Sequence, residues 1–145
     1  MEDKLIKEID HIGVSVVYFC HDGKGNFVMA KRSVNARDEY GRWDIGGGGI
    51  EFDQTVEDAL RNEIKEEYCT DFQFLGYRDV HWENNGKKTH WVALDFKVLV
   101  NSDLVKNGEP HKFDEVTWFT LETIPDNIHS QLPCFFSLYK EKLID

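Results

Sequence analysis

The sequence predicts an α/β fold of the mixed α+β kind, with one mixed sheet covered by helices on both faces. Most of the chain consists of segments whose apolar and polar residues alternate as in strands. One helical segment lies between strand segments and a second closes the chain. A doubly wound parallel sheet would need more helices alternating with its strands, so that class is excluded.

Size and composition indicate one globular domain over residues 1–145. Hydrophobic residues make up 41% of the chain and charged residues 30%, which is ordinary for a globular protein. No apolar run approaches the roughly 18 residues that a membrane span needs, and residues 1–10 lack the features of a secretory signal. We therefore expect a cytoplasmic protein without a membrane partner. Cys20, Cys69 and Cys134 are widely spaced and are expected to be reduced and mostly buried.

Two paired strands are expected at the start of the chain. Residues 12–19 and 27–32 are rich in β-branched and aromatic residues, and the turn sequence Asp-Gly-Lys-Gly-Asn lies between them at 22–26. A polar loop over 33–41 follows. Residues 42–45 are expected to form a further short strand.

The next region combines four glycines with the most regular helical pattern in the sequence. No regular element is expected over residues 46–49, because glycine has no Cβ and its backbone loses more conformational freedom on ordering than that of any other residue. Residues 50–52 are predicted to be a short strand. The helix is expected over 55–68 and begins with Thr-Val-Glu-Asp, which fits a capping box with acids near the positive end of the dipole.

The second half of the chain is expected to contain a long hairpin. Residues 72–83 and 89–100 read as strands on either side of Asn-Asn-Gly-Lys at 84–87, a strong hairpin signal. Residues 113–119 alternate like a strand, and 133–143 are predicted to form a closing helix with a proline in its first turn.

The helix over 55–68 places acids where apolar residues are expected. At about 100° per residue, one face should be a buried stripe. That stripe contains Val56, Ala59, Leu60 and Ile64. Glu63 and Glu67 project within about 20° of Val56, and Glu66 lies about 80° to one side. Carboxylates at this spacing repel one another, so either lysine and arginine side chains or a bound cation must compensate.

The net charge of −10 limits the partners that this protein can have. A nucleic-acid duplex needs a basic surface and is disfavoured. A phosphorylated small molecule can still bind if a divalent cation lies between the carboxylates and the phosphates. The six histidines show neither HExxH nor zinc-finger spacing, so no zinc site is predicted. The sequence also contains no GxSxG motif and no Walker lysine motif.

The segment from the glycines to the acids of the helix resembles the Nudix box. That pattern runs Gly, five residues, Glu, seven residues, then Arg-Glu-apolar-any-Glu-Glu-any-Gly. With Gly48 as its first glycine, Glu63, Glu66 and Glu67 stand at the expected positions. The chain is thus similar to Nudix hydrolases of the MutT-like type, and this resemblance implies an α/β/α sandwich with a mixed sheet.

Three positions depart from the Nudix pattern: Gln54 replaces Glu, Asn62 replaces Arg and Cys69 replaces Gly. In the family the arginine steadies the first glutamate of the catalytic helix, so Asn62 leaves Glu63 less constrained. Arg61 is adjacent in sequence but projects about 100° away. Two functions therefore stay open, an active diphosphatase and a catalytically weakened nucleotide-sensing or protein-binding module.

The resemblance implies Mg²⁺-dependent hydrolysis of a diphosphate bond in a nucleoside diphosphate linked to another group, with Mn²⁺ as an alternative ion. The expected partner is a small-molecule nucleotide or nucleotide conjugate. Nucleoside triphosphates, oxidised nucleotides and nucleotide sugars such as ADP-ribose all stay open as substrates. Dimers are common among similar proteins, which leaves a homodimer open.

The resemblance also implies site residues. The expected metal ligands are the carbonyl of Gly47 and the carboxylates of Glu63, Glu66, Glu67 and Glu115, with Glu109 as the second choice for the last. Glu63 and Glu66 are the catalytic candidates, and which helix residue acts as base stays open. Arg32 is the candidate phosphate contact. Phe27, Trp43, Trp82 and Trp91 are the aromatic residues available as platforms for a base, with Trp43 and Trp82 the chosen candidates, although each could also be structural.

Overall fold

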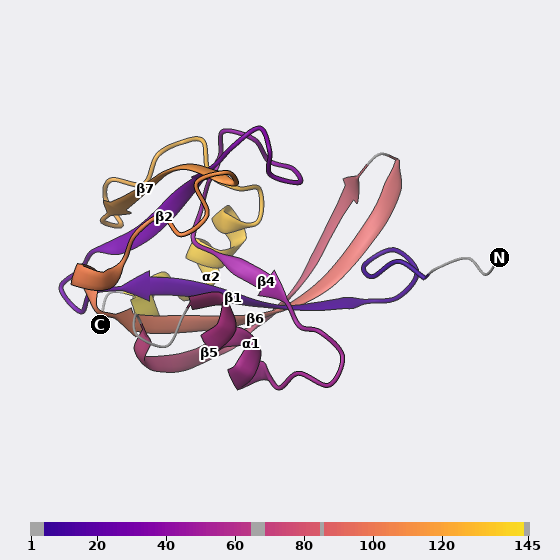
Figure 1. Cartoon of the computed structure of the whole chain (residues 1–145), viewed down its shortest axis with the longest axis horizontal. Coiled ribbons are helices and arrows are strands. Elements are labelled where there is room, and N and C mark those ends of the chain that lie inside the picture. Colours follow the sequence, from indigo (N-terminus) through magenta and orange to yellow (C-terminus); the bar gives the residue numbers. More distant parts are fainter. Residues whose placement is uncertain (1–4, 65–68, 85, 144–145) are drawn as a thin grey trace.

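The computed structural model describes residues 5–64, 69–84 and 86–143, and most of its elements are strands (Figure 1). The strands are β1 Gly13–His21, β2 Phe27–Arg32, β3 Trp43–Asp44, β4 Gly47–Gly49, β5 Cys69–Asn84, β6 Lys87–Val100 and β7 Phe113–Phe119. The helices are α1 Val56–Ile64, the short 3₁₀ helix η1 Ser102–Leu104 and α2 Leu132–Leu143.

The strands form one mixed sheet. Its main order is β3-β2-β1-β6-β5, with β4 paired to β1 and β7 paired to β2. The β1 and β6 strands run parallel, from Gly13 opposite Trp91 to His21 opposite Leu99, whereas the other named pairs are antiparallel. The predicted class, a mixed α/β fold, is confirmed.

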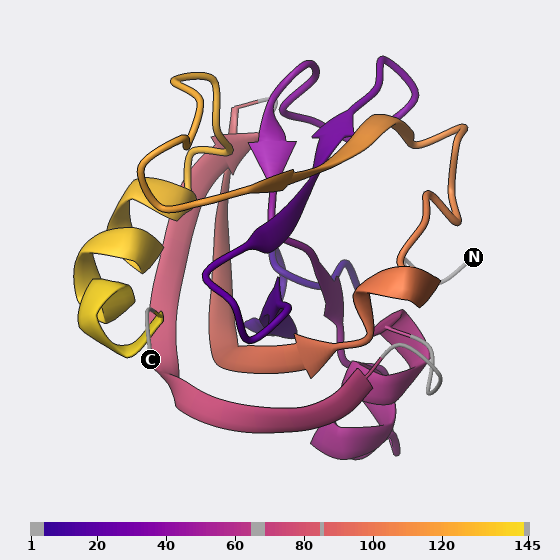
Figure 2. The same ribbon diagram turned by 90° about the vertical axis from the view of Figure 1, so that its left-hand side faces the viewer.

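The two longer helices cover opposite faces of the sheet (Figure 2). The buried cluster between α2 and the sheet consists of Val17, Phe19, Phe27, Met29, Trp43, Ile45, Leu75, Ala93, Leu132, Phe135, Tyr139 and Leu143. The buried cluster between α1 and the sheet consists of Val16, Cys20, Val28, Ala59, Leu60, Ile64, Cys69, Phe96, Val98 and Val100. Neighbouring β1 residues enter different clusters because successive side chains of a strand point to opposite faces. Each cluster removes apolar surface from water and so holds one helix on the sheet.

Helix α1 begins as its sequence predicts. The Thr55 hydroxyl accepts a hydrogen bond from the backbone N–H of Asp58 at 3.0 Å, which satisfies a donor that the first turn cannot pair. Ala59, Leu60 and Ile64 are buried as expected. Val56 is 38% exposed, so its place in the buried stripe was wrong. It is the first residue of the helix and lies beyond the edge of the cluster that α1 covers. Residues 65–68 of the expected helix lie outside the described residues.

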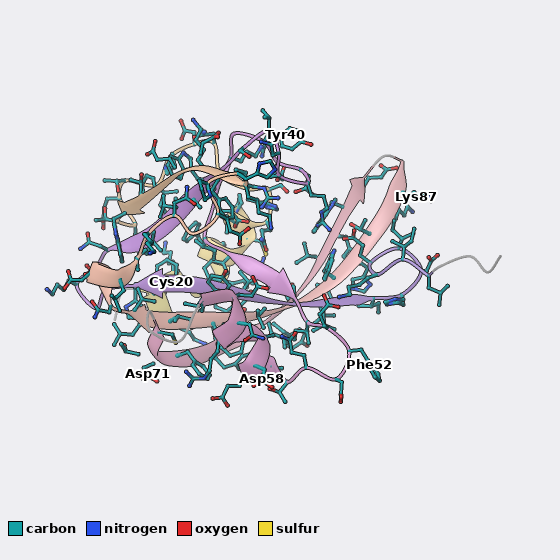
Figure 3. The ribbon with its side chains drawn as sticks, in the orientation of Figure 1. Cys20, Tyr40, Phe52, Asp58, Asp71 and Lys87 are labelled. Atoms are coloured by element: carbon teal, nitrogen blue, oxygen red, sulfur yellow. The ribbon has the colours of Figure 1, made fainter. Side chains whose placement is uncertain are left out.

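The glycine-rich segment differs from the sequence prediction. Gly47–Gly49 form β4, paired antiparallel with residues 15–17 of β1, although no regular element was expected there. Backbone pairing needs no side chain, and β1 supplies the partner groups. Residues 50–52, expected to be a strand, are not one. The Phe52 side chain is fully exposed and points away from the molecule (Figure 3), next to Asp53 at φ 69°, a turn conformation.

The β5–β6 hairpin is the longest element of the sheet and projects beyond the rest of the molecule (Figure 1). Its pairing runs from Cys69 opposite Val100 to Asn84 opposite Lys87. The predicted hairpin is therefore confirmed, with strands a few residues longer than expected. No helix among the described residues is long and apolar enough to cross a membrane. Cys20 and Cys69 are buried, whereas Cys134 is exposed.

Candidate functional site

A cavity of about 340 Å³ lies between the glycine strand β4, the end of α1 and the inner face of the β5–β6 hairpin. Gly47 and Gly48 line it from β4, and Glu63 lines it from the last turn of α1. Trp82 and Trp91 line it from the hairpin. The cavity thus joins the acidic helix to aromatic side chains that are distant in sequence.

Glu63 lies directly against the backbone of β4. A Cβ atom added to Gly48 would stand 2.4 Å from the Glu63 Cδ, and one added to Gly47 would stand 2.9 Å from the Val16 carbonyl oxygen. Real Cβ atoms do not approach other atoms this closely, so a side chain at position 47 would collide with the backbone and one at position 48 would displace the Glu63 side chain. The absence of a side chain at Gly48 therefore lets the Glu63 carboxylate lie against β4.

Partial burial raises the pKa of the Glu63 carboxyl above its ordinary value. The nearby Lys112 ammonium opposes this rise in pKa, and the Glu109 carboxylate adds to it. Both residues line the cavity, and their charged groups are 3.8 Å apart. The loop that carries them is a tight turn in which the backbone N–H groups of Lys112 and Phe113 donate to the Glu109 carbonyl. Glu63 and Glu109 thus place two carboxylates on the same cavity, with the Lys112 ammonium beside Glu109.

Glu115, the first choice for an acid from a later segment, is not among the residues that line the cavity. It is exposed on β7, opposite Lys31 of β2, and its carboxylate accepts a hydrogen bond from the Thr117 hydroxyl at 2.5 Å. Strand alternation points it to solvent. The second choice, Glu109, lies at the cavity instead, in the loop before β7.

Arg32 lines the cavity at the end of β2. Its guanidinium donates to the Asp38 carbonyl at 2.9 Å and to the Asp38 carboxylate at 3.1 Å, and it lies 3.9 Å from the Asp44 carboxylate. These acids fix its orientation, because a guanidinium presents its donors in a rigid plane.

The two predicted aromatic platforms have different positions. Trp82 lines the cavity, as a platform would need to. Trp43 does not: it is only 8% exposed and packs edge-on against Phe119 in the core, with ring centroids 5.0 Å apart. The prediction for Trp43 was therefore wrong, because β3 turns this side chain toward α2.

A buried polar network supports the far wall of the cavity. Arg78 donates two hydrogen bonds to the carboxylate of Asp95, at 2.7 and 2.8 Å, and Tyr139 donates to the same carboxylate at 2.7 Å. Arg78 also donates to the carbonyl and side-chain oxygens of Gln131, which lines the cavity. Because arginine is only a donor, it binds the amide oxygen of Gln131 and turns the amide nitrogen away.

Sequence reasoning missed several groups at this site. Lys112 and Gln131 line the cavity but stand outside the box pattern. Tyr18 also lines it, and burial raises the pKa of its phenol, with the carboxylates of Glu63, Asp44 and Glu109 contributing to the rise. Trp91 could be named from the sequence as an available aromatic, and it lines the cavity from its place opposite Val80 in the hairpin. The loop residues had no comparable signal.

The departures from the box have definite positions in the structure. Gln54 closes a turn by accepting a hydrogen bond from the Glu51 backbone N–H at 3.0 Å. Asn62 is exposed, and Arg61 pairs with Glu57 at 3.1 Å on the solvent side of α1. Arg61 therefore does not replace the missing arginine beside Glu63. Two of the predicted ligands, Glu66 and Glu67, lie outside the described residues.

The chain is similar in sequence to proteins of a known family. A model of the NUDIX domain matches residues 10–139. The nucleoside triphosphatase NudI of Enterobacter sp. (strain 638) is 28% identical over 111 residues, covering 69% of this chain and 77% of that protein. The RNA pyrophosphohydrolase of Bartonella bacilliformis is 26% identical, covering 81% of this chain and 82% of that protein.

A solved structure shares the fold. The crystal structure of a MutT NUDIX hydrolase from Burkholderia pseudomallei matches with a TM-score of 0.75 and 24% identity. The match covers 88% of this chain and 98% of that chain. The arrangement of the sheet and its two covering helices is therefore that of a known Nudix structure.

Proposed function

We propose that this chain, which belongs to the Nudix family and is a pyrophosphohydrolase of nucleotide-type substrates, acts on nucleoside triphosphates. The proposed site of hydrolysis is the cavity beside Glu63. The observation that carries this proposal is the contact between Glu63 and the bare backbone of Gly48, with Glu109 on the same cavity. The naming of NudI as a nucleoside triphosphatase favours this substrate class over nucleotide sugars.

The groups around Glu63 fit a hard divalent cation. Carboxylate and backbone carbonyl oxygens are the ligands that Mg²⁺ prefers, and the glycines leave space that a side chain would fill. We assign the ion to Glu63, Glu66, Glu67 and the carbonyl of Gly47, with Mn²⁺ as an alternative ion. Glu109 takes the place first given to Glu115. Such an ion neutralises phosphate charge and makes bound water more acidic.

The remaining cavity residues bind and orient the substrate in this proposal. Arg32 and Lys112 attract the phosphates, Arg32 as a fixed planar donor and Lys112 as a point charge. Trp82 and Trp91 offer faces on which a base can stack. The amide nitrogen of Gln131 donates to an acceptor on the nucleotide, because Arg78 holds its oxygen. Water attacks one phosphorus of the anhydride, the bridging P–O bond breaks, and the leaving phosphate departs with the electron pair.

The alternative function, a catalytically weakened nucleotide-sensing or protein-binding module, rests on Gln54 and Asn62. In the structure neither residue contacts Glu63 through a hydrogen bond among the described residues. Lys112 lies on the same cavity as Glu63, and its positive charge lowers the pKa of the Glu63 carboxyl. We therefore propose that the cavity still supplies positive charge near Glu63, through Lys112, and that the chain is active.

One assay separates the two functions. The protein is incubated with Mg²⁺ and a panel of nucleoside triphosphates, oxidised nucleotides, ADP-ribose, NADH and dinucleoside polyphosphates, and the released phosphate or nucleotide is measured. We expect turnover of nucleoside triphosphates that is lost in Glu67→Gln. Turnover only of ADP-ribose or the other conjugates would change the substrate class but not the reaction.

Turnover of none of these compounds, with Glu67→Gln equal to wild type in nucleotide binding, would favour the binding module. The matched control is Glu57→Gln, on the solvent side of α1, where the carboxylate pairs with Arg61. It changes the same residue type on the same helix and is expected to keep the wild-type rate.

A further inference from the structure

The outer face of the β5–β6 hairpin carries a group of side chains that the proposed function does not use. Among residues 5–64, 69–84 and 86–143, it is the one group of at least three histidine, cysteine or acidic side chains with metal-binding spacing. It consists of Asp79, His81 and His90, and we call it the hairpin cluster. The ligand atoms of the three side chains all lie within 4.8 Å of one another.

The pairing of the two strands creates the hairpin cluster. His81 and His90 stand directly opposite each other, and their rings stack with centroids 4.2 Å apart. Asp79 is two residues from His81 on β5, so strand alternation places both side chains on one face. The His90 Nε2 and the Asp79 Oδ1 are 2.8 Å apart. Three potential ligands from two strands thus converge.

The backbone at His90 is held in place on both sides. Its partner strand is β5, and the His90 backbone N–H donates to the Glu8 carbonyl at 2.9 Å. The next residue, Trp91, bonds through its indole N–H to the Glu8 carboxylate. These bonds to Glu8 fix the backbone of β6 at His90 and Trp91. Only the side chains of the hairpin cluster therefore need to move to bind an ion.

The chemistry of the hairpin cluster differs from that of the Glu63 cavity. Two imidazoles and one carboxylate suit Zn²⁺, which binds nitrogen at about 2.0–2.1 Å and accepts four ligands, whereas Mg²⁺ requires a shell of oxygens. Ligand atoms around a tetrahedral zinc ion are roughly 3.3 Å apart by the same bond lengths. Small rotations of exposed side chains bring atoms within 4.8 Å to that spacing.

We propose that Asp79, His81 and His90 bind one Zn²⁺ ion on the outer face of the hairpin, with water as the fourth ligand. Spacing along the chain predicts no zinc site, whereas here the ligands come together across two strands. Trp82 and Trp91 follow His81 and His90 and line the cavity on the opposite face. Bound zinc would therefore clamp the two strands directly behind the aromatic wall of the cavity.

The test measures Zn²⁺ binding to the metal-free full chain by isothermal titration calorimetry at pH 7.5. Millimolar Mg²⁺ is present throughout to saturate the oxygen ligands around Glu63. We expect one equivalent of Zn²⁺ to bind in the wild type, with an affinity reduced about 10-fold or more in His81→Ala and in His90→Ala. The control is His111→Ala, which removes an exposed histidine outside the hairpin and should bind zinc like the wild type.

Nuclear magnetic resonance of the histidine ring protons gives a second readout on the wild-type chain. Zinc is expected to shift the ring signals of two histidines in the wild type. One of these two signals should be missing from the spectrum of His81→Ala, and the other from that of His90→Ala. Circular dichroism checks that each variant is folded. Unchanged zinc affinity in both variants, loss in only one of them, or the absence of stoichiometric binding in the wild type would each overturn the proposal.

Discussion

The two faces of the β5–β6 hairpin carry polar side-chain pairs of almost equal length in different surroundings. On the inner face Arg78 and Asp95 lie 2.7 Å apart, with side chains 4% and 0% exposed. On the outer face His90 and Asp79 lie 2.8 Å apart, with side chains 32% and 55% exposed. Equal distance does not mean equal energy, because burial removes the water that would otherwise solvate a charge left alone.

This difference in burial gives the two faces of the hairpin different roles. The inner face is a rigid support, since Arg78 and Tyr139 satisfy the Asp95 carboxylate and Arg78 holds Gln131 at the cavity. The outer face is adaptable, since its side chains reach solvent and can give up their contacts with one another to bind an external ligand. We therefore expect changes on the inner face to alter stability, and changes on the outer face to alter only metal binding.

The largest expected effect is the loss of the buried pair. Arg78→Met leaves the buried Asp95 carboxylate without its cationic partner, with only the Tyr139 hydroxyl still donating to it, and should lower the free energy of unfolding by about 3–5 kcal/mol. Asp79→Asn, at the next residue but on the outer face, should cost less than about 1 kcal/mol. Urea denaturation of both variants measures the difference. Equal costs would show that the two faces do not differ as their burial indicates.

The same comparison explains what could be predicted from the sequence. The glycines and Glu63 stand within one continuous motif, so the acidic helix and its glycine partner could be identified before the structure. The strands were also readable, because their alternation is local. Glu109 could be named only as a second choice, and Lys112 and Gln131 not at all, because loop conformation brings them to the cavity.

The hairpin cluster was missed for a different reason. His81 and His90 are nine positions apart and match no metal-binding spacing, but the turn at 84–87 fixes which residues stand opposite each other. Pairing Asn84 with Lys87 places His81 opposite His90. The hairpin signal therefore contained the register, and counting back from the turn would have brought the two imidazoles together.

The second expected effect concerns the close packing behind Glu63. A Cβ at Gly48 would collide with the Glu63 carboxylate, so Gly48→Ala should displace it and reduce kcat/KM by about 100-fold. The matched change is Gly49→Ala, whose Cβ would meet its nearest atoms at 3.4–3.5 Å, an ordinary contact. Steady-state kinetics with a nucleoside triphosphate should show a much smaller loss there. Similar losses in both variants would mean that the Gly48 contact is unimportant.

The third effect distinguishes the two acids from the later segment. Glu109→Gln removes a carboxylate at the cavity and should lower kcat/KM by about 10-fold, which corresponds to about 1.4 kcal/mol. Glu115→Gln changes an exposed side chain on β7 and should leave the rate unchanged. Kinetics at several Mg²⁺ concentrations test both variants. The reverse order of effects would restore Glu115 as the relevant acid.

The smallest expected effect is on the outer face. With Mg²⁺ in excess, Zn²⁺ at ten times its Kd should stabilise the wild type by about 1.4 kcal/mol and raise Tm by a few degrees. His90→Ala should show no such rise, although its own stability should stay within about 0.5 kcal/mol of wild type because the side chain is partly exposed. Differential scanning fluorimetry measures both quantities. A zinc-dependent rise in His90→Ala equal to that of wild type would place the ion elsewhere.

The central claim is that Glu63, beside the glycine strand, binds the cation on which hydrolysis depends. The most direct measurement compares wild type with Glu63→Gln, using Mn²⁺ paramagnetic resonance for binding and nucleoside triphosphate turnover for activity. We expect Glu63→Gln to stay folded, bind Mn²⁺ more weakly and lose about 100-fold or more in kcat. Wild-type turnover together with wild-type Mn²⁺ affinity in Glu63→Gln would contradict the claim.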